Sequence, residues 1–518
     1  MFCVQDHKMK PSKLAKRAVA TLPALLRIYP LIYLTFELCC ADPVVDVKHP
    51  PMGFMSWERF RCETNCTENP QHCIHENLYM SIADALVKHG FAQAGYTQVS
   101  IDDCWTSKTG GRDPDTHRLI ADPDRFPSGI AHLAEYVHAR NLTLGIYSDA
   151  GIKTCGGYPG SQHYEELDAR TFAEWGVDYI KYDGCNIDSA DKHNNHHNVS
   201  NDAFARTYTA FGTALKHVSR KIVYSCSWPA YLQVPENNKP YSKMFHQSGC
   251  NTWRNFADVQ NTWESIYAIA MHWADEWQVL QSIPLGSYND ADMLLAGDDH
   301  HAYTLPPHQV QLQFSMWAMW ASPLFIAGDV RNMSAVYRHI LLNPHVIAIS
   351  QDASRRQADC VVGCRVTSPL GQRQNNLNAA ATIVQPMKTR VHSSDVQVWS
   401  KSLQGGESHV LAFLNLKSNA NEESTNSTVS YLFPLQGSVA QCVDLWDGQR
   451  KDSQEPQDLC GQGRGNITEN WNIRLVENKN MTVLHIRALN VKATSLRLLR
   501  VDYFCDSQFK TNSKTQWV

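Results

Sequence analysis

The segment VDYIKYDGC, residues 177–185, places apolar and β-branched side chains at alternating positions and is bounded by a glycine. This pattern predicts a buried β-strand. Lys181 and Asp183 stand two positions apart within it, so an extended chain directs both side chains to the same face. That face would otherwise bury apolar side chains, and the charged pair therefore marks a candidate functional site.

Strand-like and helix-like segments alternate from about residue 50 to residue 350. Besides 177–185, the strand-like runs are 96–105, 142–149 and 221–228, and the amphipathic runs are 76–90, 128–140, 167–176 and 309–322. This alternation predicts βα units and a parallel sheet. Some eight units in about 300 residues favour a closed (β/α)8 TIM barrel over an open doubly wound sheet, and no strand is followed by a G-x-G-x-x-G turn. We expect the barrel to occupy residues 45–352.

The pattern changes after about residue 353. Short strand-like runs such as VQVWSKSL and HVLAFLNLK are separated by polar loops, and no helix of normal length is predicted. This indicates an antiparallel β-sandwich. A chain of 518 residues is long enough for two or three domains. The expected fold class is therefore α/β, with the TIM barrel followed by a C-terminal antiparallel β-sandwich domain over residues 353–510.

The first 41 residues have the pattern of a secretory signal peptide. Basic residues between positions 8 and 17 precede an apolar stretch that ends in small residues near Ala41. An uncleaved type II anchor is the alternative, but the uncharged run at residues 28–36 is too short to span a bilayer, for which ~18 apolar residues are needed. We therefore expect a signal peptide over residues 1–41 and no stable membrane anchor.

Cysteine and glycosylation signals favour the same compartment. The 16 Cys lack the C-x-x-C and His spacing of zinc sites, so disulfides in an oxidising lumen are expected, and the odd number after the signal would leave one thiol free. The His-rich stretch at residues 193–198 overlaps a sequon and is not expected to bind a metal. Seven Asn residues open an N-x-S/T glycosylation sequon: Asn65, Asn141, Asn198, Asn332, Asn426, Asn466 and Asn480. We expect a lysosomal or secreted protein of the secretory pathway.

The charge of the chain argues against a nucleic-acid partner. The formal net charge is −4, and no basic run lies inside the predicted folded region. The 14 Trp suit stacking on sugar rings, although Trp is more often part of a hydrophobic core.

Charged and aromatic residues recur where the predicted strands end. In a TIM barrel the active site lies at the carboxyl ends of the strands. A single Asp at such a place is often only the N-cap of the next helix. Here six strand ends carry candidates, which favours an active site: Asp102, Asp103, Tyr147, Asp149, Lys181, Asp183, Ser227 to Tyr231, Arg254, Asp258, Asp292 and Met293.

These residue types suit the cleavage of a glycosidic bond. Its oxocarbenium-like transition state needs an ionised carboxylate beneath the anomeric carbon and a protonated carboxyl beside the leaving oxygen. Lys181 would favour the ionised form of Asp183 if its ammonium lay within ~4–6 Å, keeping that carboxylate nucleophilic at acidic pH. The alternative is a buried Lys–Asp pair that only neutralises itself.

Six motifs, in order, are GYTQVSIDDCW, LGIYSDAG with a following TC, DYIKYDGC, YSCSWPAY, NTWRNFAD and NDADM. Over about residues 50–352 the chain resembles the α-galactosidase and α-N-acetylgalactosaminidase family of retaining glycoside hydrolases, the melibiase-type family 27. The resemblance implies a (β/α)8 barrel followed by an antiparallel β domain, a homodimer, and glycan substrates on glycolipids and glycoproteins. It implies no cofactor and no metal.

The resemblance also implies roles for individual residues. Asp183 would be the nucleophile and Asp258 the general acid/base, with their carboxyl groups ~5–5.5 Å apart, as retention of configuration requires. The implied disulfides are Cys62–Cys104, Cys66–Cys73, Cys155–Cys185 and Cys226–Cys250. The implied sugar contacts are Trp57, Asp102, Asp103, Tyr147, Cys155, Lys181, Ser227, Ala230, Tyr231, Arg254, Asp292 and Met293.

The stretch CSWPAY, residues 226–231, bears on the choice of sugar. Galactose-selective members of the family resemble C-E-W-P-L-Y there, whereas this chain has Ser227 and Ala230. An acetamido group at C2 would collide with Glu and Leu, while Ala leaves room for its methyl and Ser can bond its carbonyl. We expect hydrolysis of terminal α-linked N-acetylgalactosamine with residual α-galactosidase activity. The alternatives are an α-galactosidase in which the two changes affect packing only, and a non-catalytic sugar-binding protein.

Two regions depart from the family pattern. YNDADM, residues 288–293, replaces the usual W-N-D-P-D-M and lacks its Pro, in the stretch that contains Asp292 and Met293. The exit from the barrel, QDASRRQADCVVGC, also differs, so Cys360 and Cys364 receive no assignment. In the second domain Cys442 and Cys460 could pair.

Overall fold

The computed structural model describes residues 45–188, 200–297, 304–365, 393–406, 408–417, 427–434, 438–446, 459, 471–478, 481–491 and 495–504. The predicted signal peptide and the His-rich stretch at 193–198 lie outside these residues. So do four of the sequons, those of Asn198, Asn426, Asn466 and Asn480.

Eight parallel strands form the first sheet, in the order β7-β6-β5-β4-β3-β2-β1-β8. Leu294, just after β7, forms a parallel bridge with Ile326 of β8, which joins the two ends of this order. The prediction of a TIM barrel is therefore confirmed. The strands are β1 (Met52–Met55), β2 (Gln98–Ser100), β3 (Thr143–Asp149), β4 (Tyr179–Asp183), β5 (Val223–Cys226), β6 (Thr252–Arg254), β7 (Tyr288–Asp290) and β8 (Leu324–Ile326).

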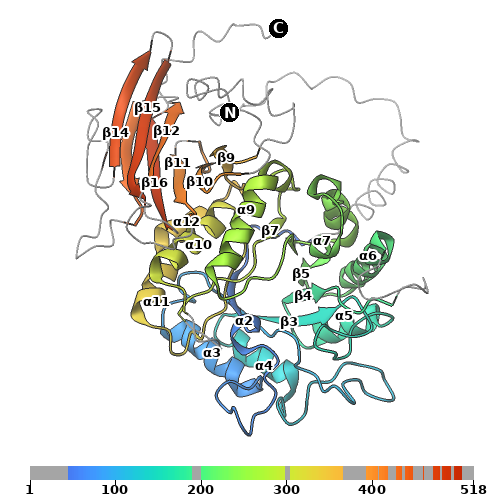
Figure 1. Ribbon diagram of the computed structural model, residues 1–518. Coiled ribbons are helices and arrows are strands. Elements are labelled where there is room, and N and C mark those ends of the chain that lie inside the picture. Colours follow the sequence, from blue (N-terminus) through green and yellow to red (C-terminus); the bar gives the residue numbers. More distant parts are fainter. Residues whose placement is uncertain are drawn as a thin grey trace, which may run out of the picture.

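Helices follow the strands and lie outside them (Figure 1). The four amphipathic runs seen in the sequence correspond to α3, α4, α5 and α10. Side-chain hydroxyls cap the first turns of α6 and α9, where Ser200 accepts from the N–H of Ala203 and Thr262 accepts from the N–H of Ser265. The longer helices are α3 (Glu76–Lys88), α4 (Gly129–His138), α5 (Glu165–Glu174), α6 (Asn201–His217), α9 (Trp263–Leu280), α10 (Pro307–Met319), α11 (Ala335–Leu341) and α12 (Pro344–Ser350). The short ones are α2 (Trp57–Phe60), α7 (Trp228–Tyr231), η1 (Glu236–Asn238), α8 (Tyr241–Lys243) and η2 (Met244–Ser248).

The second part of the chain is an antiparallel β-sandwich, as predicted. Its five-stranded sheet has the order β13-β16-β11-β10-β9 and its three-stranded sheet the order β12-β15-β14. Buried Leu411 and Phe413 of the first sheet share one core with Trp471 and Ile486 of the second. The strands are β9 (Asp359–Val362), β10 (Val396–Ser402), β11 (Ser408–Asn415), β12 (Ser427–Pro434), β13 (Ser438–Asp444), β14 (Trp471–Asn478), β15 (Met481–Val491) and β16 (Ser495–Phe504).

The sandwich packs against α10 and α12 of the barrel (Figure 1). Trp399 of β10 meets Trp320 edge to face, with ring centroids 5.6 Å apart. Lys401 Nζ, also from β10, donates to the carbonyl oxygens of Ala318 and Ile349 at 3.1 and 2.6 Å. This contact explains why α10 is buried on nearly every face, which its weakly amphipathic sequence only partly indicates.

Among the described residues, no helix combines the length and apolar composition that crossing a bilayer would require.

Candidate active site

The predicted site residues converge on the carboxyl ends of the barrel strands. Trp57 follows β1, Asp102 and Asp103 follow β2, and the remaining candidates lie at or just after the ends of β3 to β7. Direct contacts join several of them into two clusters, one around Asp183 and one around Arg254. The structure therefore brings together residues that lie as far apart in sequence as positions 57 and 292.

The first cluster is centred on Asp183, the last residue of β4. Its Oδ1 accepts a hydrogen bond from the Tyr231 hydroxyl at 2.6 Å, and its Oδ2 accepts one from the Tyr147 hydroxyl at 3.0 Å. The backbone N–H of Gly184 also donates to Oδ1, at 3.0 Å. A carboxylate held by three donors has a fixed orientation.

Lys181, two positions before Asp183, forms its ion pair with Asp102. Its Nζ donates to Asp102 Oδ2 at 2.8 Å. Burial disfavours the ammonium, but Asp102, Asp183 and Asp292 together more than offset this and raise the pKa of Lys181 above its ordinary value. The side chain therefore acts as one cation shared among several carboxylates, because β3 lies between β2 and β4 and the long lysine stem spans it.

The second cluster is centred on Arg254, the last residue of β6. Its Nη2 lies 3.0 Å from Asp258 Oδ1 and 2.9 Å from Asp292 Oδ2. Arg254 and Asp292 are buried, whereas the side chain of Asp258 is 67% exposed and can reach a bound ligand. The guanidinium of Arg254 lowers the pKa of Asp258, against a smaller opposing effect of burial.

Asp292 adopts a strained backbone to enter this cluster. Its φ is +74°, in the left-handed region that residues other than Gly rarely occupy. Asp290 Oδ1 accepts from the N–H of Asp292 at 2.8 Å, and Asp292 Oδ2 accepts from the N–H of Val259 at 2.8 Å. Surrounding contacts thus hold a conformation that costs ~1–3 kcal/mol, as is common at functional sites. Burial raises the pKa of Asp292, although Arg254 opposes the shift.

Asp103 is almost completely buried at the end of β2. It accepts hydrogen bonds from the N–H groups of Cys104 and Gly156 at 2.6 and 2.7 Å. A Cβ at position 156 would lie 2.9 Å from Asp103 Oδ2, so glycine permits this close approach. Burial raises the pKa of Asp103 to about 6 despite these donors.

Ser227 and Ala230 stand at the start of α7, next to the first cluster. The N–H of Ala230 donates to the carbonyl of Ser227 at 3.1 Å, so the two residues are one turn apart on one side of the helix. Ser227 is 6% exposed. Within the described part of the chain, no residue forms a hydrogen bond with the Ser227 hydroxyl, which leaves it available to a ligand.

The structure contains five disulfides between described residues. Four are those implied by the family resemblance, Cys62–Cys104, Cys66–Cys73, Cys155–Cys185 and Cys226–Cys250. The fifth, Cys360–Cys364, was not assigned from the sequence. Cys442 is also disulfide-bonded, and Cys460 lies outside the described residues.

The acidic groups and sulfurs at the ends of β3 and β4 do not suit a metal. Asp149, Cys155, Asp183 and Cys185 place four potential ligand atoms within 4.8 Å of one another. Both sulfurs are joined in the Cys155–Cys185 disulfide, and zinc binding needs the thiolate form. Only two carboxylates remain, and each already accepts hydrogen bonds from the protein.

Several site residues received no role from the sequence. Asp149 was noted as a strand end, and the structure pairs it in register with Asp183 across β3 and β4. Glu58 and Asp290 are buried acids beside the second cluster, and burial raises their pKa values to about 7 and about 6. Arg61 lies on the Trp57 indole. Among these residues, only Glu58 could have been suspected from the sequence, because it directly follows Trp57, a predicted sugar contact.

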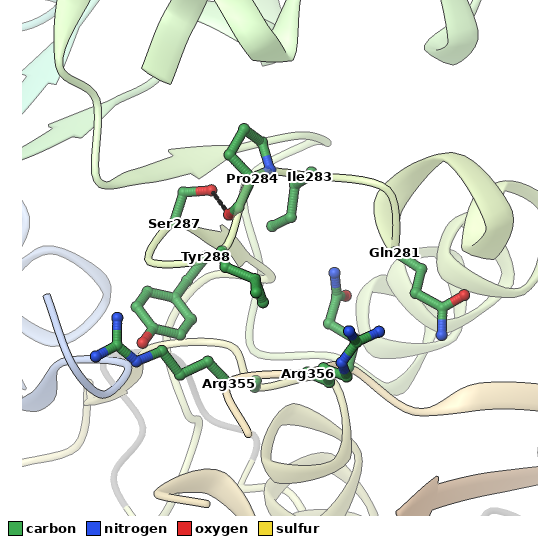
Figure 2. A pocket seen from close by; sticks show the side chains of 10 residues that line it. Gln281, Ile283, Pro284, Ser287, Tyr288, Arg355 and Arg356 are labelled. Atoms are coloured by element: carbon green, nitrogen blue, oxygen red, sulfur yellow. Dashed lines mark hydrogen bonds between the residues drawn. The ribbon is translucent and has the colours of Figure 1, made fainter. Parts of the chain in front are cut away.

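A hollow of about 170 Å³ lies elsewhere, at the amino end of β7 (Figure 2). Pro284, Ser287, Tyr288, Arg355 and Arg356 contribute to its lining. None of the predicted site residues lines it. It is therefore separate from the site at the carboxyl ends of the strands.

A TIM barrel that presents one fixed carboxylate and one exposed carboxylate at the carboxyl ends of its strands has the groups that glycosidic cleavage requires. This fold and site define a glycoside hydrolase.

Comparison with known proteins gives the family. A family model described as "Alpha galactosidase A" matches residues 49–352, and one described as "Alpha galactosidase C-terminal beta sandwich domain" matches residues 393–459. The chain therefore belongs to the alpha-galactosidase A family and is an α-glycosidase.

Individual relatives have two named activities. Alpha-galactosidase A of Homo sapiens is 42% identical over 312 residues, which cover 60% of this chain and 68% of that protein. Alpha-N-acetylgalactosaminidase of Gallus gallus is 36% identical over 406 residues, which cover 78% and 87%. The solved alpha-galactosidase from Saccharomyces cerevisiae has a TM-score of 0.62 at 24% identity and covers 88% of this chain and 98% of that chain, which shows a shared fold.

Proposed function

We propose that this protein is a retaining exo-glycosidase that removes terminal α-linked N-acetylgalactosamine from glycolipids and glycoproteins. The observation that carries the choice of sugar is the hydroxyl of the buried residue Ser227, which has no hydrogen-bond partner among the described residues and lies one turn from the small side chain of Ala230. Together they leave space and one hydrogen-bonding group for an acetamido substituent. Relatives with both named activities occur, so an α-galactosidase is the second candidate.

The reaction proceeds by double displacement. Asp183 attacks the anomeric carbon while Asp258 gives its proton to the leaving glycosidic oxygen, so that a glycosyl ester forms and the aglycone departs. Asp258, now ionised, then removes a proton from water. The hydroxide attacks the same carbon from the opposite face, breaks the ester and releases the sugar with its original configuration.

The surrounding contacts suit these two roles. Tyr147 and Tyr231 fix both oxygens of Asp183, which prepares the carboxylate for in-line attack. The exposed side chain of Asp258 can reach the glycosidic oxygen and later a water molecule. In the free enzyme Arg254 lowers the pKa of Asp258. The first step needs the protonated carboxyl, and acidic conditions are therefore required to populate it.

The remaining charged residues grip the sugar. Asp102, Asp103 and Lys181 lie beside the nucleophile and offer two carboxylates and an ammonium to the sugar hydroxyls, while Arg254 and Asp292 close the other side. We place Trp57 and Met293 against the apolar surface of the ring, and the exposed Cys155 at the edge of the pocket. The sequence YNDADM differs from the family's usual motif but retains Asp292. The carboxylate of Asp292 forms an ion pair with Arg254.

The specificity is tested by comparing α-GalNAc and α-galactoside substrates on wild type and on Ser227→Glu combined with Ala230→Leu. The double variant should shift the ratio of kcat/KM values toward galactose by about 100-fold, because the larger side chains exclude the acetamido group. Ser227→Ala is the matched control, which removes the hydroxyl without adding bulk and should weaken only the GalNAc substrate. An unchanged ratio in the double variant would assign the two residues to packing alone.

Catalysis itself is tested with Asp183→Asn. An enzyme loses about 10⁴-fold or more in kcat while retaining sugar affinity, whereas a sugar-binding protein on this scaffold has no turnover to lose. A mechanism-based 5-fluoro sugar should label the peptide that contains position 183, and NMR should detect the α-anomer as first product. A label on another peptide, or the β-anomer, would refute the assignment.

We further propose a lysosomal or secreted homodimer with a catalytic domain over residues 45–352 and a β-sandwich domain over residues 353–510. Asn65, Asn141 and Asn332 are exposed in the structure and accessible to the glycosylation machinery. Loss of mass on treatment with peptide N-glycosidase tests passage through the secretory pathway, and sedimentation tests the dimer.

A further inference from the structure

Arg61 lies at the rim of the active site in an unusual backbone conformation. It follows α2 directly, and its φ of +44° with ψ of −141° is outside the regions that non-glycine residues normally occupy. The N–H of Arg61 still donates to the Trp57 carbonyl at 2.8 Å. A strained residue beside a predicted sugar contact invites the question of what its side chain does there.

The guanidinium of Arg61 contacts three different parts of the site. Nη2 pairs with the carboxylate of Glu58, which is 5% exposed. The guanidinium carbon lies 5.4 Å from the centre of the Trp57 indole. Nη2 also lies 3.4 Å from Oε1 of Gln260, two residues after Asp258. One side chain therefore connects the segment after β1 with the segment after β6.

We propose that Arg61 is a positioning residue, which holds the Trp57 indole and the Asp258 segment in place and which, together with Glu58, controls the positive charge near Asp258. The inference rests on the proposed role of Asp258 as general acid/base.

The charges around Asp258 support this inference. Arg254 lowers the pKa of Asp258 most strongly and Lys181 adds to the effect, while Arg61 contributes a further lowering. The carboxylate of Asp258 raises the pKa of Asp292 by repulsion between like charges. Tyr231 also faces Asp258 but carries no charge in the working range, because its pKa is raised further by burial.

Glu58 determines how much of the Arg61 charge is compensated. Burial raises the pKa of Glu58 to about 7, while Arg61 opposes the shift and Asp292 adds to it. Above this pH the pair is neutral overall. Below it Glu58 takes up a proton, and the full charge of Arg61 then acts on the Asp258 segment.

The experiment measures kcat/KM against pH on a substrate with a poor leaving group, for which protonation by the general acid matters most. The alkaline limb of this profile reports ionisation of the general acid in the free enzyme. Arg61→Met keeps the length of the side chain and removes its charge, so the alkaline limb should move up by about half a pH unit, the effect expected of one partly screened charge. KM should rise as well, because the Trp57 indole loses its neighbour.

Two further variants separate charge from structure. Arg61→Lys retains the charge and should keep the limb near its wild-type position. Glu58→Gln retains a hydrogen-bond acceptor for Arg61 but removes the negative charge beside it. The alkaline limb of this variant should therefore not move to higher pH. If all three variants lower the maximum of kcat/KM and leave the alkaline limb of its pH profile in place, Arg61 is only structural and the proposal fails. Should Arg61→Met not fold, an upward shift in Arg61→Lys or in Glu58→Gln would overturn it.

Asp258→Asn distinguishes failure of this inference from failure of the proposed function. If Asp258 is the general acid, this variant loses the alkaline limb and most of its activity on poor leaving groups. A variant that keeps both would refute the role of Asp258 itself. Loss of the limb in Asp258→Asn combined with unshifted Arg61 variants would refute only the positioning role.

Discussion

The hydroxyl of Tyr231 donates to Oδ1 of Asp183 at 2.6 Å, and this hydrogen bond joins α7 to the end of β4. The same tyrosine is the last residue of the short helix that contains Ala230. The residue pair that we assign to sugar selection and the nucleophile are thus linked through one side chain. The fold therefore links the residues of the proposed specificity to the proposed nucleophile.

Tyr231→Phe should lower kcat/KM, because the carboxylate of Asp183 loses one of the two hydroxyl groups that orient it. The variant removes a hydrogen bond to the carboxyl group of Asp183, an interaction of ~1.5–3 kcal/mol. Tyr136→Phe is a matched control, since Tyr136 also donates to an aspartate, Asp84, at 3.0 Å but on the outside of the barrel. If kcat/KM of Tyr231→Phe stays as close to wild type as that of Tyr136→Phe, this hydrogen bond does not support the proposed role of Asp183.

The Cys155–Cys185 disulfide should support both stability and activity. It closes a loop with a sequence separation of 30, for which loss of the cross-link costs ~3–4 kcal/mol in the chain-entropy account. Cys185 Sγ lies 3.3 Å from the Tyr231 hydroxyl, so the bond also buttresses the tyrosine that holds Asp183.

Replacing both cysteines by serine should therefore lower the free energy of unfolding and kcat together. The matched control is the double serine variant of Cys66 and Cys73, which close a loop with a separation of only 7, outside both clusters around Asp183 and Arg254. Denaturant unfolding and steady-state kinetics measure the two effects. Equal activity in the two double variants would contradict the buttressing role.

Buried acids should make the protein more stable as the pH falls from about 7 to about 5. Burial raises the pKa of Asp103 and of Asp290 to about 6 and that of Glu58 to about 7. A carboxyl whose pKa is higher in the folded state binds more protons there than in the unfolded chain. Its stabilising contribution is complete below the unfolded value and is lost as the pH rises through the folded value.

Asp290→Asn tests this linkage. The amide oxygen can still accept from the N–H of Asp292, so the variant should keep its fold and lose the penalty of a buried charge, about 2–3 kcal/mol above pH 6. Its Tm should exceed that of wild type at pH 7.5 and approach it at pH 5. Asp124→Asn, on an exposed turn, is the control and should show the wild-type dependence. If the Tm of Asp290→Asn depends on pH in the same way as that of wild type, the raised pKa of Asp290 is refuted.

The fold could be predicted because its signals are local and repeated. Alternating strands and amphipathic helices specify a parallel barrel, and a barrel collects the carboxyl ends of its strands, so Asp102, Lys181 and Arg254 could be placed in one site without coordinates. The partner of Lys181 could not be predicted. Only the register of β2, β3 and β4 directs its ammonium to Asp102, 79 positions away in the sequence.

The residues that were missed depend on tertiary burial. Glu58 looks like an ordinary helix residue in the sequence, and only packing against the segment after β6 buries its carboxylate. Arg61 looks like a surface cation until its guanidinium is seen on the Trp57 indole. No periodicity or spacing reports such contacts, because they join loops from strands that are far apart in the chain.

The Lys181–Asp102 pair yields the last prediction. Both side chains are largely buried, with 13% and 2% of their surfaces exposed. Lys181→Met leaves the carboxylate of Asp102 without its cation, which should cost ~3–5 kcal/mol of stability and abolish most activity. Asp102→Asn leaves the ammonium near Asp183 and Asp292, which still favour its charge, so this variant should lose less stability.

The double variant, Lys181→Met with Asp102→Asn, separates folding from function. It removes both buried charges at once and should regain most of the stability lost in Lys181→Met, since an unpaired buried ion is what destabilises the single variant. Activity should not return, because the sugar hydroxyls have lost a carboxylate and an ammonium together. Denaturant unfolding of all four proteins gives the coupling energy, and kcat/KM gives the loss of substrate contacts. If the two single variants have additive effects on stability, the 2.8 Å contact contributes no net interaction, and the role of Lys181 as a shared cation would have to be abandoned.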